Sequence, residues 1–263
     1  MRWLSSRSGE DARPTVAGVS EPSAPIRSFV EPEDGARTHP NYGRWKHVIP
    51  LPTPGLIAST GGPSVENFLV VGEAWAQVLC TLLVEPGARV LDIGCGCGKT
   101  ARRLVDHPFI SSYVGFDVIH ESVEWCRQFI APRSAGRFRF EHFDVYSGAY
   151  NPQGAIRGSQ VAFPAGDAAV TLAFAASLFT HLLEPDARHY LREVARVLAP
   201  GVGSALLSIH VDVPPGERYV GGEPRIDVAP DYFVAMACES GLVLVESMGD
   251  LCGQEAFLFR TRS

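Results

Sequence analysis

Apolar residues along the chain follow two spacings that alternate. Spacings of three and four residues, with fitting ends, predict helices in the stretches 65–83, 99–107, 120–131, 184–199 and 230–240. Short apolar runs bounded by turn residues predict strands in the stretches 85–94, 112–118, 137–145, 168–176, 204–211, 242–249 and 255–262. Strands that alternate with helices predict a doubly wound, mostly parallel α/β sheet with helices on both faces.

Two connections between these elements are long and rich in glycine and proline. They cover residues 146–167 and 212–228, and substrate selectivity is expected to reside in loops of this kind. The last two strands are joined by a short turn, which predicts an antiparallel pair. Ligands of doubly wound sheets bind beyond the carboxyl ends of the strands, where the strand order reverses, so the site is expected there.

The N-terminal part of the chain has a different pattern. Residues 1–40 are rich in proline, serine, glutamate and arginine without an apolar period, which predicts a flexible tail. Residues 41–64 mix prolines with aromatic residues and predict an extended segment that packs on a domain formed by residues 65–263. Within that segment, the side chains that could close over a ligand, or simply pack at the domain edge, are Tyr42, Trp45 and His47.

The composition agrees with one large α/β domain. The chain has 263 residues, of which 46% are hydrophobic and 20% charged. Its net charge of -6, without a lysine or arginine run, argues against nucleic acid as a partner. Neither a secretory leader nor a run of about 18 uncharged apolar residues is found, so no membrane span is expected. Six scattered cysteines without an export signal predict reduced thiols and a cytoplasmic location.

The stretch RVLDIGCGCGKTARRL, residues 89–104, places a glycine-rich loop between a predicted strand and a predicted helix. A phosphate-binding P-loop requires a glycine where this chain has Ile93, and a dinucleotide-binding loop requires one where it has Lys99. The pair Cys95 and Cys97 is a weak metal signal without a second pair nearby. The pattern that remains is an acid followed by alternating glycines, which lets a ligand contact the backbone directly.

Acidic residues at the ends of the first three predicted strands point to a nucleoside ligand. Asp92 precedes the glycines, and a carboxylate there favours a cationic or hydroxyl-bearing ligand over a phosphate; it could also cap the amides of its own loop. Asp117, at the end of the second strand, could accept hydrogen bonds from both ribose hydroxyls. Asp144, at the end of the third, could bind the amino group of an adenine.

Five stretches in order, VLDIGCGCGKTARRL, YVGFDV, FEHFDV, FAASLFTHL and REVARVLAPGV, together resemble the class I S-adenosylmethionine-dependent methyltransferases. The resemblance covers residues 65–263 and implies a seven-stranded, Rossmann-like methyltransferase sheet with one antiparallel strand at its edge. It implies S-adenosyl-L-methionine as the cofactor, and no metal is expected. One departure is Val202-Gly203, where relatives often have two glycines, and it affects only a turn.

The resemblance also implies where the cofactor lies. The glycines approach its methionine part, Asp117 binds the ribose, and Asp144 lies beside the adenine. The residues expected to contact it are Asp92, Gly94, Cys95, Gly96, Gly98, Asp117, Val118, Asp144, Val145, Phe174 and Ala175, with Ala176 beside them.

Transfer of a methyl group from a sulfonium requires alignment and, for a hydroxyl acceptor, removal of a proton. His181, after the fourth strand, is the first candidate for this general base, since an imidazole titrates near neutral pH. Its alternative role is to cap or pack the following helix. His210, near the end of the fifth strand, is the second candidate, and its alternative is a hydrogen-bonded histidine at a strand end.

The expected function is therefore methylation of a small-molecule acceptor, at oxygen, such as a sugar, a lipid-linked compound or a natural product. Nitrogen and carbon acceptors stay open, because no residue in the sequence chooses among them. Two further alternatives are an NAD-dependent oxidoreductase, which the glycine spacing opposes, and a non-catalytic relative that binds the cofactor or a partner protein. The oligomeric state is not indicated.

Overall fold

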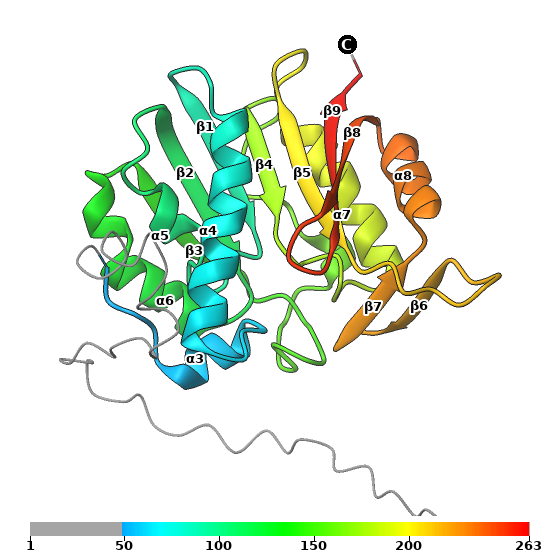
Figure 1. Ribbon diagram of the computed structural model, residues 1–263, viewed down its shortest axis with the longest axis horizontal. Coiled ribbons are helices and arrows are strands. Elements are labelled where there is room, and N and C mark those ends of the chain that lie inside the picture. The colour runs from blue at the N-terminus through cyan, green and yellow to red at the C-terminus, as the bar shows by residue number, and fades with distance from the viewer. Residues whose placement is uncertain (1–48, 263) are drawn as a thin grey trace, which may run out of the picture.

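The computed structural model describes residues 49–262 and contains a seven-stranded sheet in the order β3-β2-β1-β4-β5-β9-β8 (Figure 1). The predicted tail and the roles of Tyr42, Trp45 and His47 lie outside the described residues. The strands are β1 Ala88–Ile93, β2 Ile110–Asp117, β3 Phe138–His142, β4 Leu172–Ala175, β5 Ser204–Ile209, β8 Leu242–Asp250 and β9 Glu255–Thr261.

The first five strands are parallel, and the strand order reverses between β1 and β4. β9 runs antiparallel to both of its neighbours, β5 and β8. The predicted antiparallel pair of final strands is therefore confirmed, whereas the predicted place of the antiparallel strand is wrong. β9 lies one position inside the sheet, and β8, which is parallel to the first five strands, forms the edge.

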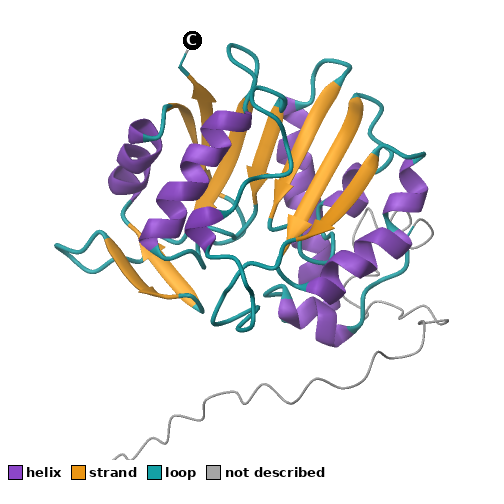
Figure 2. Ribbon diagram, turned by 180° about the vertical axis from the view of Figure 1, so that it is seen from behind, coloured by secondary structure: helices purple, strands orange, loops and turns teal. Residues whose placement is uncertain are grey.

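Helices cover both faces of the sheet, as the alternating pattern predicts (Figures 1 and 2). One face carries α4, α5 and α6, whose buried side chains pack with those of β1 and β2. The other carries α7 and α8. The helix bounds are α4 Val65–Leu82, α5 Ala101–Leu104, α6 His120–Phe129, α7 Glu184–Val197 and α8 Pro230–Glu239.

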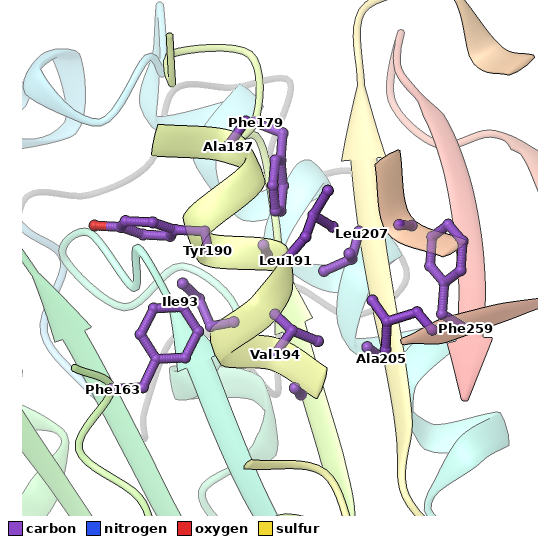
Figure 3. Packing of buried hydrophobic residues seen from close by; sticks show 14 of the residues in the cluster. Ile93, Phe163, Phe179, Ala187, Tyr190, Leu191, Val194, Ala205, Leu207 and Phe259 are labelled. Atoms are coloured by element: carbon purple, nitrogen blue, oxygen red, sulfur yellow. The ribbon is translucent and has the colours of Figure 1, made fainter. Parts of the chain in front are cut away.

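The larger core lies between α7 and the sheet (Figure 3). α7 begins with Pro185 in its first turn and places Leu191 and Val194 on its inner side, both fully buried. They pack toward Ile93 and Leu207 of the sheet. Full burial of each such side chain stabilises the fold by roughly 1.5–3 kcal/mol. This packing fixes the start of α7, which borders the site described below.

Two elements were not anticipated from the sequence pattern. The connection 212–228 contains a two-stranded antiparallel hairpin, β6 Tyr219–Gly222 and β7 Arg225–Val228. The segment before α4 contains a short helix, α3 Pro54–Ser59, where extended chain was expected. Thr53 caps this helix by accepting a hydrogen bond from the Leu56 amide, and Pro54 suits its first position. α3 packs on the domain through Ile57, which is 1% exposed.

Among the described residues, no helix combines the length and the apolar character needed to cross a membrane.

Candidate active site

A cavity of about 1020 Å³ opens beyond the carboxyl ends of β1, β2 and β4, at the point where the strand order reverses. Its walls come from the glycine loop, the turn after β4, the connection after β3, the start of α7 and the tip of the β6–β7 hairpin. Of the residues expected from the sequence, it is lined by Gly94, Cys95, Gly96, Asp117, Val118, Val145 and His181.

The glycine loop presents its backbone to the cavity at two positions. Gly94 and Gly96 have φ values of +77° and +51°, which side chains other than glycine rarely adopt. A Cβ on Gly96 would also lie 2.8 Å from Cγ2 of Thr60, just after α3. Gly98 has a different role, since a Cβ there would lie 2.2 Å from Cδ1 of Ile130, and it does not line the cavity.

Asp117 joins the end of β2 to the glycine loop. Its Oδ2 accepts a hydrogen bond from the Gly96 amide at 2.7 Å, and its Oδ1 accepts one from the Ile119 amide at 2.9 Å. Burial raises the pKa of this carboxyl, while hydrogen bonds from the backbone amides of Ile119, Gly96 and Val118 oppose the rise. Each carboxylate oxygen has a further lone pair, so Asp117 can also accept from a ligand hydroxyl in the cavity.

Asp92 is placed beneath the loop rather than in the cavity. Its side chain is 2% exposed and accepts a hydrogen bond from the Tyr113 hydroxyl of the neighbouring strand β2. Burial raises the pKa of Asp92 to about 7, although the Tyr113 hydrogen bond lowers it. The structure therefore gives Asp92 a partner inside the protein, and no cavity contact of its side chain supports the expected cofactor contact.

The stability of the protein is expected to fall as the pH rises from about 4 to 7, because only the unfolded chain ionises Asp92 in that range. Asp92→Asn removes this titration and keeps an acceptor for Tyr113. A shift of about three pKa units corresponds to roughly 4 kcal/mol. In urea unfolding at pH 4, 6 and 8, the free energy of unfolding of the variant, relative to that of the parent, should increase with pH by about this amount. An equal difference at every pH would contradict the assignment.

Lys99 is a cavity residue that the sequence analysis used only to reject a dinucleotide loop. It lines the cavity at the end of the glycine loop. Burial lowers the pKa of its ammonium group, while Cys97, Asp92, Cys252 and Asp117 oppose the fall. Its backbone is fixed by α4, because a Cβ on Gly72 would lie 2.2 Å from the Lys99 carbonyl oxygen. Lys99 gives this end of the cavity a positive group that a ligand carboxylate could contact.

The wall after β4 begins later than expected. Phe174 and Ala175 are fully buried in the sheet, whereas Ala176, which was also expected, lines the cavity together with Ser177. Ser177 has a φ of +66°, and its side chain accepts a hydrogen bond from Nε2 of Gln254 at 2.6 Å. A left-handed backbone at a non-glycine residue is uncommon and is retained where the surroundings enforce it.

Two further expected residues also lie outside the cavity. The Asp144 carboxylate accepts from the side-chain amide of Asn151 at 3.1 Å and from the Ala155 amide at 3.3 Å, so it organises the connection after β3. His210 follows β5 and pairs with Asp227 of β7 in an isolated bridge. Neither lines the cavity, so the structure brings neither to the other candidate residues there.

His181 lines the cavity and has its ring held on two sides. Its Nδ1 lies 2.7 Å from the Glu223 carbonyl oxygen, which can only accept, so Nδ1 carries the proton. Burial lowers the pKa of the imidazole, as do His210 and Lys99, whereas the Glu223 carbonyl raises it. The ring is therefore neutral at pH 7, with the lone pair on Nε2. This is the protonation state that a general base requires.

The part of the cavity around His181 is aromatic and acidic. Tyr150 and Tyr190 line it, together with the carboxylates of Asp186 and Glu223. Burial and the charge of Glu223 raise the pKa of Asp186. Among the described residues that line this end, there is no lysine or arginine. Sequence reasoning missed Tyr150 and Glu223 because they lie in irregular connections, although GGEP at 221–224 is a recognisable turn signal. Asp186 and Tyr190 lie in α7, whose apolar period does not indicate which side chains reach a cavity.

The chain is similar in sequence to known methyltransferases. Residues 90–201 match a family model described as a methyltransferase domain. An O-methyltransferase of Pyrenophora dematioidea is 28% identical over 137 residues, 52% of this chain and 45% of that protein. The O-methyltransferase cnsE of Penicillium expansum is 28% identical over 151 residues, 57% of this chain and 48% of that protein. The chain thus spans about half the length of the curated relatives that it matches.

Solved structures share the fold. The 1,6-didemethyltoxoflavin-N1-methyltransferase of Burkholderia thailandensis, crystallised with 1,6-didemethyltoxoflavin and S-adenosylhomocysteine, aligns with a TM-score of 0.57 at 18% identity, covering 81% of this chain and 92% of that one. The seven-stranded sheet, the glycine loop at the reversal of strand order and the match over residues 90–201 agree with one another. The chain has the fold of the class I S-adenosylmethionine-dependent methyltransferases, and its residues 90–201 match a methyltransferase domain.

Proposed function

We propose that this protein transfers a methyl group from S-adenosylmethionine to a hydroxyl oxygen of a neutral or cationic small molecule. The observation that carries the proposal is the contact of His181 Nδ1 with the Glu223 carbonyl oxygen at 2.7 Å, which leaves the lone pair of the ring to Nε2, in the same cavity as Asp117 and the glycine loop. The curated relatives named O-methyltransferases support the choice of oxygen.

The residues that line the cavity fit the successive parts of the cofactor, from its methionine part through its ribose to its adenine. Lys99 can bind the carboxylate of the methionine part, and Gly94 and Gly96 line the cavity with backbone at positive φ. Asp117 can accept hydrogen bonds from the ribose hydroxyls, while Val118 and Val145 offer apolar contact to the adenine. When bound, the cofactor supplies a methyl group activated on a sulfonium sulfur. Asp144 supports the loop that carries Val145 and is not assigned a direct contact.

The residues around His181 then perform the remaining chemistry. Nε2 takes the proton of the acceptor hydroxyl while the oxygen electron pair forms the bond to the methyl carbon. The electron pair of the carbon–sulfur bond goes to sulfur, and the imidazolium releases its proton to solvent. A positioned base of this kind contributes typically 10²–10⁴-fold. His210 lies outside the cavity and has no part in this assignment.

The acceptor class follows from the charges at this end of the cavity. Asp186 and Glu223 oppose an acceptor that carries a phosphate or carboxylate, because like charges at close range repel. The tyrosine rings suit an apolar or cationic group. Nucleic acid is not proposed as the acceptor for the same reason, because its phosphates are negatively charged. No disulfide joins the six cysteines, all of which lie within the described residues, and this fits the cytoplasmic location proposed from scattered cysteines without an export signal.

Calorimetric titration with S-adenosylmethionine and with NAD tests the cofactor. Binding of the first and none of the second is expected, and the reverse would overturn the proposal in favour of an oxidoreductase. Turnover is then followed by mass spectrometry on pairs of aromatic and sugar acceptors that differ only in a hydroxyl, an amino or a carboxylate group. Methylation of hydroxyl compounds is expected. Product from the amino partner alone would overturn the choice of oxygen, and cofactor binding without any product would favour a non-catalytic relative.

A further inference from the structure

The tip of the β6–β7 hairpin reaches the cavity through a single residue, Glu223. Its carbonyl oxygen accepts the hydrogen bond from Nδ1 of His181 at 2.7 Å. Its carboxylate Oε2 accepts from the Ser147 hydroxyl at 2.7 Å and from the Ala149 amide at 3.0 Å. One side chain and its own backbone therefore link the candidate base to the connection after β3.

That connection supplies a second support for the imidazole. The Ser147 hydroxyl also accepts from the Tyr150 amide at 3.2 Å. The Tyr150 hydroxyl lies 3.2 Å from both ring nitrogens of His181, and the two rings meet edge-on, with an interplanar angle of 81°. This contact orients the imidazole without selecting between its two nitrogens, so the choice of the protonated nitrogen rests on the Glu223 carbonyl.

The hairpin needs such an anchor. It consists of two four-residue strands outside the main sheet, and an isolated hairpin of this size is marginally stable. Its base is attached at Val228, whose amide donates to the His210 carbonyl oxygen at 2.8 Å, and nearer the turn the Ile226 amide donates to the Thr180 carbonyl oxygen at 2.8 Å. Its tip is attached by the two hydrogen bonds of the Glu223 carboxylate. Loss of these bonds frees the carbonyl that holds Nδ1.

We infer that Glu223 is the positioning residue of His181: its carbonyl selects the protonated nitrogen, and its carboxylate holds the turn that carries Tyr150. The inference rests on the proposed function only for its catalytic consequence, since the tautomer of His181 is a property of the free protein. The β6–β7 hairpin then positions the candidate base, in addition to forming a wall of the cavity.

The charged and titratable groups facing His181 determine the sign of the expected pH effect. Lys99 of the glycine loop and His210 after β5 lower the pKa of His181, whereas the carbonyl and the charge of Glu223 raise it. Tyr150 faces the ring as a neutral hydroxyl, because burial raises its pKa above the ordinary value. Removal of the Glu223 side chain is therefore expected to lower the pKa of His181 further.

The test is long-range ¹H–¹⁵N correlation NMR on protein labelled at histidine nitrogen, with the His181 signals assigned from their loss in His181→Gln. In the parent chain, His181 is expected as the tautomer protonated at Nδ1. In Glu223→Ala, it is expected to become a mixture of tautomers with a lower pKa. Glu223→Gln, which keeps a side-chain oxygen for Ser147 or Ala149, should retain the parent tautomer. Glu217→Ala, exposed on the same connection, is the matched control and should change nothing.

An Nε2-protonated His181 in the parent chain, or an unchanged tautomer and pKa in Glu223→Ala, would overturn the inference. Activity adds a separate readout. About a tenfold loss of kcat is expected in Glu223→Ala, with the dissociation constant for S-adenosylmethionine unchanged. If the NMR result holds while the protein methylates no acceptor, the proposed function fails and the positioning of His181 stands. If methylation proceeds with an unchanged tautomer, only the inference fails.

Discussion

Replacement of Asp117 by alanine is expected to weaken binding of S-adenosylmethionine by about 10²–10⁴-fold. In the proposed complex, the variant loses the hydrogen bonds that two ribose hydroxyls donate to the carboxylate, which are worth roughly 1.5–3 kcal/mol each. It also frees the Gly96 amide, which Asp117 holds at 2.7 Å, so the glycine loop loses an anchor. Calorimetric titration of the cofactor measures the change, and thermal unfolding separates it from a loss of fold.

Asp144→Ala is the matched comparison, since it removes an aspartate at the next strand end whose carboxylate binds the protein itself. A loss below tenfold is expected there. If Asp144→Ala weakened the cofactor as much as Asp117→Ala does, the adenine contact inferred from the sequence would be restored. If Asp117→Ala bound the cofactor as well as the parent chain, the ribose assignment would be wrong.

The second large effect is expected at His181. His181→Ala should lower kcat by about 10²–10⁴-fold, with little change in cofactor affinity, because the proposed role of the imidazole is to take the acceptor proton. The parent enzyme should lose activity as the pH falls through the pKa of His181, which lies below the ordinary value of 6.5. It should keep full activity above that range. In the variant, this acid limb of the pH profile should disappear.

His210→Ala provides the control, because His210 lies nearby but does not line the cavity. It should leave kcat within a few-fold of the parent value. Removal of His210 should also move the acid limb slightly upward, since His210 lowers the pKa of His181. An unchanged kcat in His181→Ala at saturating acceptor would eliminate His181 as the base.

The helices and strands around the main sheet could be predicted because their burial gives the apolar residues a regular spacing in the sequence. The strands β1, β4 and β5 are buried along nearly their whole length, so they appear as short apolar runs. α7 separates an apolar from a polar side, and its period is visible without a structure. The hairpin 219–228 lacked such a signal, because its first strand is half-exposed and contains two glycines.

The site was predictable only in part, because a motif fixes where a residue lies and not where its side chain points. Asp92 and Asp117 both end parallel strands, yet Asp92 turns toward Tyr113 and Asp117 toward the glycine loop and the cavity. The contacts of Glu223 and Tyr150 with His181 join positions far apart in the chain. No local spacing encodes such contacts, since the tertiary fold alone brings them together.

The position of α3 sets the smallest stretch of chain that can complete this cavity. Ser59 and Thr60 are part of its wall, and the buried Arg102 donates to the Ile49 carbonyl oxygen at 2.6 Å. The matched methyltransferase region, 90–201, contains none of these three N-terminal positions. A fragment starting at Val65 would expose Cys97 and Trp125 and leave a buried guanidinium without that carbonyl. The functional unit therefore extends at least from Ile49, well before the recognisable sequence motifs begin.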